Sequence, residues 1–281
     1  MEKVGVDMLR IGDIVTRRSY GSDIYFRIIG IQPRGYVDLV GIDYRIRADA
    51  HPMDLNIIEK QSWLTDRLFF ASQVDQRIAQ IVRERKKTDQ EKYQGKNVVR
   101  KTGKVLHMDG DPMYLTICMN YYKKLGIHAY GETVIESQQP QQIKTLLKKY
   151  QPDIVVITGH DSIAKDKDQK NIQNYRSSAY FVEAVKEARQ YEADMDTLVI
   201  FAGACQSYYE EIIQAGANFA SSPQRVMIHA LDPVFITEKI AYSSVKQVLT
   251  IEEILSNTIT NIQGIGGFET RGKAREGAPM T

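Results

Sequence analysis

Apolar runs broken by polar turns divide the chain into three stretches. Residues from about 10 to 60 hold several short runs rich in β-branched and aromatic residues, separated by turn-prone groups such as 20–23 and 33–35. From about 65 to 93, apolar positions recur every three to four residues, which is typical of a helix. From residue 104 onward, apolar runs alternate with helical patterns. This order predicts a small β module, a helical connector and an α/β domain.

The third stretch has the βαβα rhythm of a parallel sheet with helices on both faces. Gly126 is placed to end one helix, and Pro140 suits the first turn of the next. The tail from Gly264 is glycine-rich and then basic, so we expect it to have little fixed structure. The expected strands lie near 105–108, 127–130, 154–158, 198–202 and 226–228, and later helices near 208–215, 233–245 and 251–262.

Three segments are therefore expected. Residues 1–62 form the β module, whose short strands are similar in outline to an SH3-like barrel. Residues 63–97 form the helical connector, because the turn-prone stretch 94–97 breaks the helical pattern. Residues 98–281 form the α/β domain. The predicted fold class is α/β, with a parallel sheet preceded by a small barrel.

Composition narrows the possible partners. The formal net charge of +2 over 281 residues offers no electrostatic basis for binding nucleic acid. No apolar segment approaches the roughly 20 residues of a membrane span, and residues 1–7 lack the apolar core of a signal peptide. Two cysteines form no disulfide framework and fit a reducing compartment. We expect a soluble cytoplasmic protein without nucleic-acid or membrane partners; its oligomeric state stays open.

Two of the expected strands end in chemically capable side chains. Residues 154–161 end in His160 and Asp161, and residues 198–205 end in Cys205. The carboxyl ends of parallel strands form one edge of a sheet, where open α/β sheets bind ligands. A neighbouring imidazole or a helix N-terminus lowers the pKa of a thiol and makes it a nucleophile. The two strand ends therefore predict a nucleophile and its base.

The surroundings of Cys205 fit this prediction. If the chain is helical from Gln206 onward, the thiol lies at a helix N-terminus. Gly203 and Ala204 leave room beside it for a substrate backbone. The separation from His160, 205 − 160 = 45 residues, accommodates a loop, a helix and the next strand. The alternative for each residue alone is a packed side chain without a chemical role.

The second cysteine and the other histidines are expected to have structural rather than chemical roles. Cys118 falls on the apolar stripe of a helix and is expected in the core. His107 and His128 are expected to be packed or surface residues, whereas His229 could line a pocket wall. No C-x-x-C or H-E-x-x-H spacing exists, and the glycines at 264–267 lack the Lys-Ser/Thr of a phosphate loop. We therefore expect no metal and no cofactor.

Three segments carry a resemblance to a known family. Val-Ile-Thr-Gly-His-Asp-Ser at 156–162, Phe-Ala-Gly-Ala-Cys-Gln-Ser at 201–207 and Ile-Gly-Asp-Ile-Val at 11–15 resemble the sporulation-specific YabG peptidase family. The likeness covers essentially the whole chain and places it in the caspase/gingipain/separase class. It implies a caspase-like α/β fold and a cysteine endopeptidase that processes spore-coat and related precursor proteins. The implied location is the mother-cell cytoplasm or the spore coat.

The resemblance also implies roles for individual residues. Cys205 is the nucleophile and His160 the base, and the small residues Gly159, Gly203 and Ala204 belong with Asp161 to the active-site loops. In the wider class a glycine follows the histidine and helps to form the oxyanion site. Asp161 stands there instead, so the second oxyanion donor beside the Cys205 N–H is open, with the Asp161 N–H as a candidate. The Asp161 side chain either orients the imidazole or faces solvent, and we expect solvent.

Arginine-specific relatives of this fold use an acidic residue after the first strand to hold the substrate's cation. Asp109 and Asp111 stand at that position, and a carboxylate is the group that a guanidinium requires. The equal alternative is a polar turn after a strand. The resemblance to self-processing peptidases makes the basic tail and residues 165–167 candidate self-cleavage sites.

Two other functions stay open from the sequence. One is a non-catalytic spore-assembly scaffold that retains a peptidase-like fold. The other is a flavodoxin-like phosphoacceptor or small-ligand-binding domain built on Asp109 and Asp111. Loss of substrate cleavage in Cys205→Ala would separate the peptidase from both.

Overall fold

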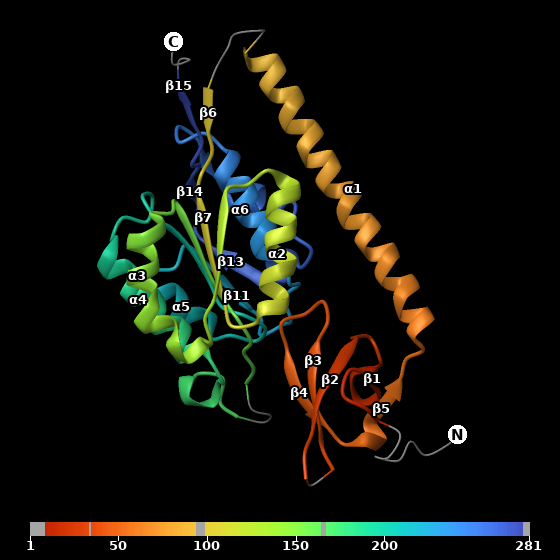
Figure 1. The fold of residues 1–281 in the computed structure, drawn as a ribbon. Helices are drawn as coiled ribbons and strands as arrows, with labels where there is room; N and C mark the ends of the chain where they lie inside the picture. Colours follow the sequence, from red (N-terminus) through yellow and green to blue (C-terminus); the bar gives the residue numbers. More distant parts are fainter. Residues whose placement is uncertain (1–8, 34, 94–98, 164–166, 278–281) are drawn as a thin grey trace. The chain divides into compact units, whose positions relative to one another are not determined.

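The computed structural model describes residues 9–33, 35–93, 99–163 and 167–277 (Figure 1). The chain divides into two compact units, Met1–Lys87 and Thr88–Thr281. The end of the expected connector at 94–97, residues 165 and 166 of the expected self-cleavage loop, and the last residues of the tail, 278–281, lie outside the described residues. Each unit is described by itself below.

The first unit contains a five-stranded antiparallel sheet in the order β4-β3-β2-β1-β5. Its strands alternate in the way a half-buried sheet requires: Phe26 and Ile28 are fully buried, whereas Ile29 and Ile31 are exposed. The expected β module is therefore present, and its closure into an SH3-like barrel stays a prediction. The elements are β1 (Ile14–Arg17), the 3₁₀ turn Arg18–Tyr20, β2 (Phe26–Ile31), β3 (Val37–Gly41), β4 (Arg47–Ala50), the 3₁₀ turn Pro52–Asp54, β5 (Leu55–Ile57) and the start of the long helix α1 (Lys60–Tyr93).

The second unit is built on a six-stranded sheet in the order β13-β11-β10-β9-β7-β8. Its neighbouring strands are parallel except for β13, which runs antiparallel to β11. Every residue of β7, β9 and β10 is buried, as expected for parallel strands covered on both faces. The strands are β7 (Val105–Asp109), β8 (Ala129–Thr133), β9 (Ile154–Thr158), β10 (Val199–Ala202), β11 (Phe219–Ser221) and β13 (Ile265–Gly267).

Helices cover both faces of this sheet. In Figure 1, α2 and α6 lie on one face, and α3, α4 and α5 lie on the other. This arrangement confirms the α/β class, while the likeness to caspases in detail stays a prediction. The helices are α2 (Pro112–Leu125), α3 (Gln139–Tyr150), α4 (Ser178–Tyr191), α5 (Tyr209–Gln214), α6 (Asp232–Tyr242), α7 (Ile251–Leu255) and α8 (Asn261–Gly264), with 3₁₀ turns Glu136–Gln138 and Ile172–Asn174.

Local sequence sets the ends of the helices nearest to the predicted site. Asp111 caps the N-terminus of α2, with Pro112 in the first turn. Gly126 ends the same helix with a φ of 72°, a left-handed conformation that glycine adopts without strain. Pro140 lies in the first turn of α3. The sequence predictions for Gly126 and Pro140 are thereby confirmed.

Two expectations about the C-terminal part of the chain were wrong. The fifth parallel strand is β11 rather than 226–228, because the latter segment forms no ladder; of its three residues only Ile228 is buried. The described part of the glycine-rich tail forms three paired strands: β13 pairs with β11, β14 (Thr270–Arg271) with β12 (Val248–Leu249), and β15 (Arg275–Gly277) with β6 (Val99–Lys101). Glycine at 267 is required there, because a Cβ would overlap the carbonyl oxygen of Asn218.

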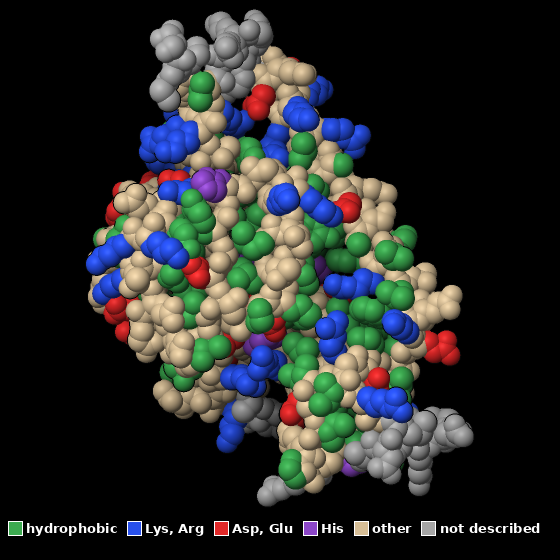
Figure 2. Space-filling view, viewed as in Figure 1, with side chains coloured by type: hydrophobic (Ala, Val, Ile, Leu, Met, Phe, Trp, Pro, Cys, Tyr) green, Lys and Arg blue, Asp and Glu red, His purple; other side chains and the backbone are tan. Residues whose placement is uncertain are grey.

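The distribution of charged and apolar side chains on the surface does not indicate a particular class of binding partner. On the face shown in Figure 2, Lys and Arg side chains are interspersed with acidic and hydrophobic ones. None of the described helices combines the length and apolar character needed to span a bilayer.

Candidate active site

His160 and Cys205 follow adjacent parallel strands. In the register of β9 and β10, Ala202 lies beside Ile157, and the Gly203 N–H donates to the Ile157 carbonyl at 3.0 Å. β9 ends at Thr158 and β10 at Ala202, so His160 and Cys205 each come two or three residues after the carboxyl end of one of these neighbouring strands. The two turns therefore leave the sheet side by side at its carboxyl edge, the position at which open α/β sheets do chemistry.

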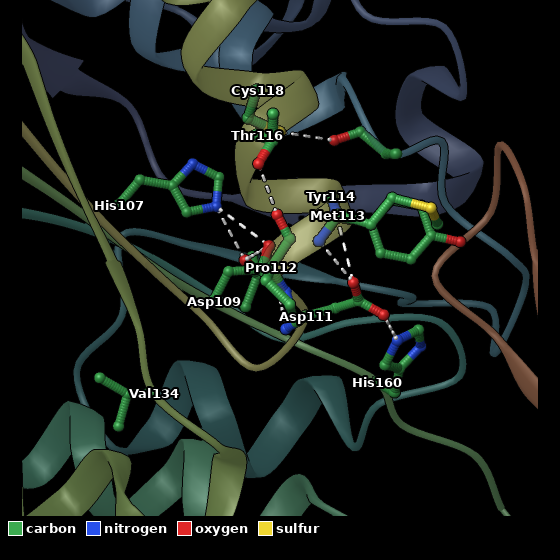
Figure 3. Close-up of polar contacts among 12 residues, drawn as sticks. His107, Asp109, Asp111, Pro112, Met113, Tyr114, Thr116, Cys118, Val134 and His160 are labelled. Carbon is green, nitrogen blue, oxygen red and sulfur yellow. Dashed lines mark hydrogen bonds and ion pairs between the residues drawn. The ribbon is translucent and has the colours of Figure 1, made fainter.

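The imidazole of His160 is held from one side only. Its Nε2 lies 2.7 Å from Oδ2 of Asp111, and the ring centroid lies 5.5 Å from that of Tyr114 (Figure 3). Because a carboxylate only accepts, Nε2 carries the proton of this bond. The opposite nitrogen, Nδ1, is buried and has no hydrogen-bond partner among the described residues. A neutral His160 thus presents a basic nitrogen on the side away from Asp111.

Asp111 is fixed by its own helix. Its Oδ1 accepts from the Met113 N–H at 2.8 Å and the Tyr114 N–H at 3.4 Å, leaving Oδ2 for His160. Burial by itself raises the pKa of the Asp111 carboxyl, but the hydrogen bond and charge of His160 outweigh it, so the net shift is downward. Asp111 is therefore an anion that selects the tautomer and orientation of the imidazole.

Asp109 lies beneath this pair in a buried polar network. Its Oδ1 accepts from the Asp111 N–H at 2.9 Å, and its Oδ2 accepts from the Thr158 hydroxyl at 3.0 Å. Thr158 Oγ1 also lies 2.9 Å from Nε2 of His107, whose Nδ1 lies 3.1 Å from the Tyr122 hydroxyl. Asp109 is 0% exposed and Asp111 8%. Neither aspartate, both expected as candidate binders of a substrate cation, presents an open carboxylate.

Asp161 differs from expectation. Its side chain is fully buried rather than in solvent, and it points to the α4 side of the sheet, away from the imidazole. Consecutive residues of an extended chain face opposite sides, which explains why His160 meets α2 and Asp161 meets the start of α4. Burial raises the pKa of the Asp161 carboxyl despite hydrogen bonds from Ser162, Ser177, Ser178 and Ser207.

The sulfur of Cys205 is covered by main chain. The residue is 0% exposed; the Ile228 N–H donates to Sγ at 3.4 Å, and Sγ–H points to the Ile228 carbonyl at 3.7 Å. The helix expected at 208–215 is present as α5, but it begins at Tyr209, and Gln206 adopts a φ of 59°, so Cys205 does not lie at its N-terminus. The Gln206 N–H instead donates to the Ser222 hydroxyl at 2.9 Å. The turn is therefore shaped by side-chain hydrogen bonds rather than by a helix.

The main-chain N–H groups in the turns that follow β9 and β10 differ in their hydrogen-bond acceptors. The His160 N–H donates to Glu136 Oε1 at 2.7 Å, and the Ala204 N–H donates to the Ser207 hydroxyl at 2.9 Å. The Asp161 N–H has no acceptor among the described residues. Gly159 gives the Glu136 carboxylate its space, because a Cβ there would overlap it. Asp161 is 0% exposed, so its main-chain N–H lies inside the protein.

The other cysteine and two further histidines have partners outside the Asp111–His160 pair. Cys118 is fully buried on α2, as expected, with its Sγ 3.4 Å from the Ala230 carbonyl. His229 is buried, and its Nδ1 accepts from the Leu231 N–H at 3.1 Å. His128 Nε2 lies 3.0 Å from the Tyr130 hydroxyl. Among the described residues, no group of three or more His, Cys, Asp and Glu side chains is arranged to hold a metal ion.

Sequence reasoning did not single out Tyr114, Glu136, Ser178 and Ser207. Glu136 and the two serines reach the site through side-chain hydrogen bonds between segments far apart in the sequence. A partial signal existed for Asp111, since Asp followed by Pro at the end of a strand is typical of a helix N-cap. Its contact with His160 required the order of β7 and β9 in the sheet.

The sequence is similar to known proteins over most of its length. A profile of the YabG peptidase U57 family matches residues 10–279. The chain is also 42% identical over 284 residues to the "Sporulation-specific protease YabG" of Bacillus subtilis (strain 168), a match that covers 96% of this chain and 98% of that protein.

Proposed function

Because the chain belongs to the YabG peptidase family, we propose that it is a cysteine endopeptidase of sporulation in which Cys205 is the nucleophile and His160 the base. The observation that supports these roles best is the Asp111–His160 bond. It leaves Nδ1 of His160 without a partner among the described residues, at the sheet edge to which β10 delivers Cys205. An imidazole oriented in this way by a carboxylate is the arrangement that activates a nucleophile.

The proposed reaction proceeds through an acyl-enzyme. The Cys205 thiol passes its proton to Nδ1 of His160, and the thiolate attacks the peptide carbonyl carbon. The imidazolium, stabilised by Asp111, then protonates the leaving amine as the C–N bond breaks and a thioester remains. Water attacks the thioester, loses its proton to His160, and releases the acid while the thiol is restored.

Two amides are proposed to bind the oxyanion. They are the N–H of Cys205 and that of Asp161, which follow β10 and β9 respectively. The Asp161 N–H is suited to this role because it has no acceptor among the described residues, whereas the His160 N–H is bound to Glu136. Preorganised amides of this kind are worth about 3 kcal/mol each in acyl transfer.

We propose spore-coat and related precursor proteins as substrates, in the mother cell or at the coat, with cleavage after arginine. That Asp109 or Asp111 holds the arginine stays a prediction: Asp109 is buried and Asp111 is bound to His160, so either carboxylate would have to exchange a present partner for the guanidinium. Asp111→Asn is expected to lower kcat by about 100-fold or more for Arg, Lys and Gln peptides alike. A rise in KM confined to Arg peptides would instead identify Asp111 as the substrate-binding carboxylate.

The decisive experiment compares wild type, Cys205→Ala and His160→Ala for cleavage of a candidate coat protein. Both variants are expected to lose activity by at least about 1,000-fold while keeping the wild-type melting temperature within a few degrees. Cys118→Ala is the control, because its sulfur is buried on α2 and no step requires it. Cleavage retained by Cys205→Ala would refute the cysteine mechanism.

The scaffold alternative draws on one observation, the complete burial of Cys205 under Ile228. It predicts that wild type and Cys205→Ala behave identically and that a peptide electrophile does not label the thiol. The phosphoacceptor alternative requires an exposed aspartate at the end of β7, and Asp109 is 0% exposed.

A further inference from the structure

The carboxylate of Asp161 takes no part in the reaction proposed above, yet it receives four hydrogen bonds. Its Oδ1 accepts the N–H groups of Ser162 and Ser177 at 2.9 and 2.8 Å. Its Oδ2 accepts the hydroxyls of Ser178 and Ser207, the latter at 2.9 Å. Burying a carboxylate is costly unless such donors surround it, so this arrangement needs a reason beyond filling space.

Both serine hydroxyls connect Asp161 to the turn that carries the nucleophile. Ser207 Oγ accepts the Ala204 N–H at 2.9 Å, and Ser178 Oγ accepts the Tyr208 N–H at 2.8 Å. Ala204 and Tyr208 lie on either side of Cys205 along the chain. One carboxylate oxygen is thus linked, through two hydroxyls, to both ends of the turn.

We propose that Asp161 is a positioning residue that holds the turn of Cys205 in place beside the turn of His160. The inference rests on the proposed function, because it assigns Asp161 to the alignment of that nucleophile and base. Asp161 directly follows His160, so its fixed side chain also fixes the end of β9 and its own N–H. The same four bonds therefore set the thiol, the imidazole and one proposed oxyanion donor relative to one another.

The backbone of the turn explains why such an anchor is needed. Gly203 has a φ of 108° and Gln206 a φ of 59°, so the chain between β10 and α5 is in neither strand nor helix conformation. A non-glycine residue at positive φ is strained and persists only where its surroundings hold it. Ser222 holds the other side, accepting the Gln206 N–H at 2.9 Å and donating to the Ala204 carbonyl at 3.3 Å. Loss of one anchor should displace the thiol without unfolding the sheet.

The test uses the full-length protein and removes single hydroxyls. Ser178→Ala and Ser207→Ala each break one of the two links, and the double variant breaks both. Ser177→Ala is the matched control: it removes a buried neighbouring hydroxyl, while its main-chain bond to Asp161 remains. The readouts are kcat and KM for a cleaved peptide, and the pH dependence of Cys205 alkylation by iodoacetamide, followed by peptide mapping.

We expect each single variant to lower kcat about 10-fold and the double variant about 100-fold, with KM changed by less than about threefold. The midpoint pH of Cys205 alkylation should rise in the double variant, because a displaced thiol loses its imidazole neighbour. Ser177→Ala should stay within about twofold of wild type in both assays. A merely structural network would lower the melting temperature but leave kcat and the alkylation midpoint of the folded protein unchanged.

Failure of this inference is distinguishable from failure of the proposed function. If Cys205→Ala is inactive and the double serine variant matches Ser177→Ala, the positioning role is overturned and the mechanism stands. If Cys205→Ala still cleaves, the mechanism itself is wrong and the positioning role is overturned with it.

Discussion

One hydrogen bond determines which nitrogen of His160 can act as a base. Asp111 uses Oδ1 for the N-terminus of α2 and Oδ2 for Nε2, so the proton of a neutral imidazole stays on Nε2. An asparagine at 111 would cap the helix equally well but would place an amide N–H group opposite Nε2. The imidazole would then carry its proton on Nδ1, and its basic nitrogen, Nε2, would face residue 111. The cap and the catalytic orientation are thus separable functions of one residue.

The pH dependence of the free energy of unfolding reports on the hydrogen bond between Asp111 and His160. The net pKa of Asp111 is lowered from its usual 3.8, so its contribution is present above about pH 4 and is lost as the pH falls through the lower, folded-state value. We expect Asp111→Asn to reduce the free energy of unfolding by about 1–3 kcal/mol at pH 7. The difference from wild type should shrink below about pH 4 in urea unfolding curves.

Asp161→Asn is the control with the opposite sign. Burial raises the pKa of Asp161, so at pH values between the ordinary pKa and the raised one the folded protein retains a proton there that the unfolded chain has lost. Wild type should therefore gain stability relative to this variant as the pH falls through the raised value. A difference for Asp111→Asn that is constant from pH 7 to pH 3 would contradict the charge pairing with His160.

At the scale of elements, burial determines what the sequence predicts. β7, β9 and β10 are covered on both faces, so their apolar runs and the residues that follow them were placed correctly. Residues 226–228 are apolar but form no strand: Ile228 is 0% exposed, and its main-chain N–H donates to Cys205 Sγ. β11 is short and contains small residues, and it has too little apolar length to be recognised. The apolar content of a segment therefore indicates whether it is buried, but it does not indicate whether the segment pairs with a neighbouring strand.

The hydrogen bonds of the site were not predictable in the same way. His160 and Cys205 follow from strand ends, which the sequence displays. Ser178 and Ser207 approach Asp161 only after the helices are packed and the sheet order is set. A serine side chain carries no periodic signal, because it bonds equally well to water, to its own turn or to a distant carboxylate.

Residues 225–228, the segment that covers the thiol of Cys205, are anchored by the side chain of Arg225. Its Nε donates to the Tyr175 hydroxyl at 2.7 Å and its Nη1 to the Ser222 carbonyl at 3.1 Å, and Nη2 pairs with Glu210. The guanidinium carbon also lies 5.2 Å from the ring centroid of Tyr208. In the proposed mechanism a substrate carbonyl must reach Sγ, so the main chain at Ile228 would have to move first.

Removing this anchor should expose the thiol. We expect Arg225→Ala to raise the alkylation rate of Cys205 about fivefold, which corresponds to about 1 kcal/mol less stability for the closed segment. Arg271→Ala is the control, because it breaks an ion pair with Asp196 at 3.2 Å that does not involve the segment. Equal rates in wild type and both variants would show that the sulfur is reached without movement of this segment.

At the scale of the whole molecule, each of the two units has a core of its own. The first buries the inner face of its antiparallel sheet, including Ile28, and the second buries both faces of its parallel sheet, with Ile143 of α3 in that core. Every residue assigned to the reaction, from Asp111 to Cys205, belongs to the second unit. Heat inactivation should therefore follow the second unit alone.

Matched core truncations test this independence. Ile28→Val and Ile143→Val each remove one methylene from a side chain that is 0% exposed, at a cost of about 1 kcal/mol. We expect calorimetry of the full chain to resolve two transitions, each lowered by about 2–8 °C in only one of the variants. Peptidase activity measured after heating should be lost with the transition that Ile143→Val lowers and should not respond to Ile28→Val. A single transition that both variants lower equally would mean that the two units unfold as one cooperative body, and that the β module contributes to the stability of the active site.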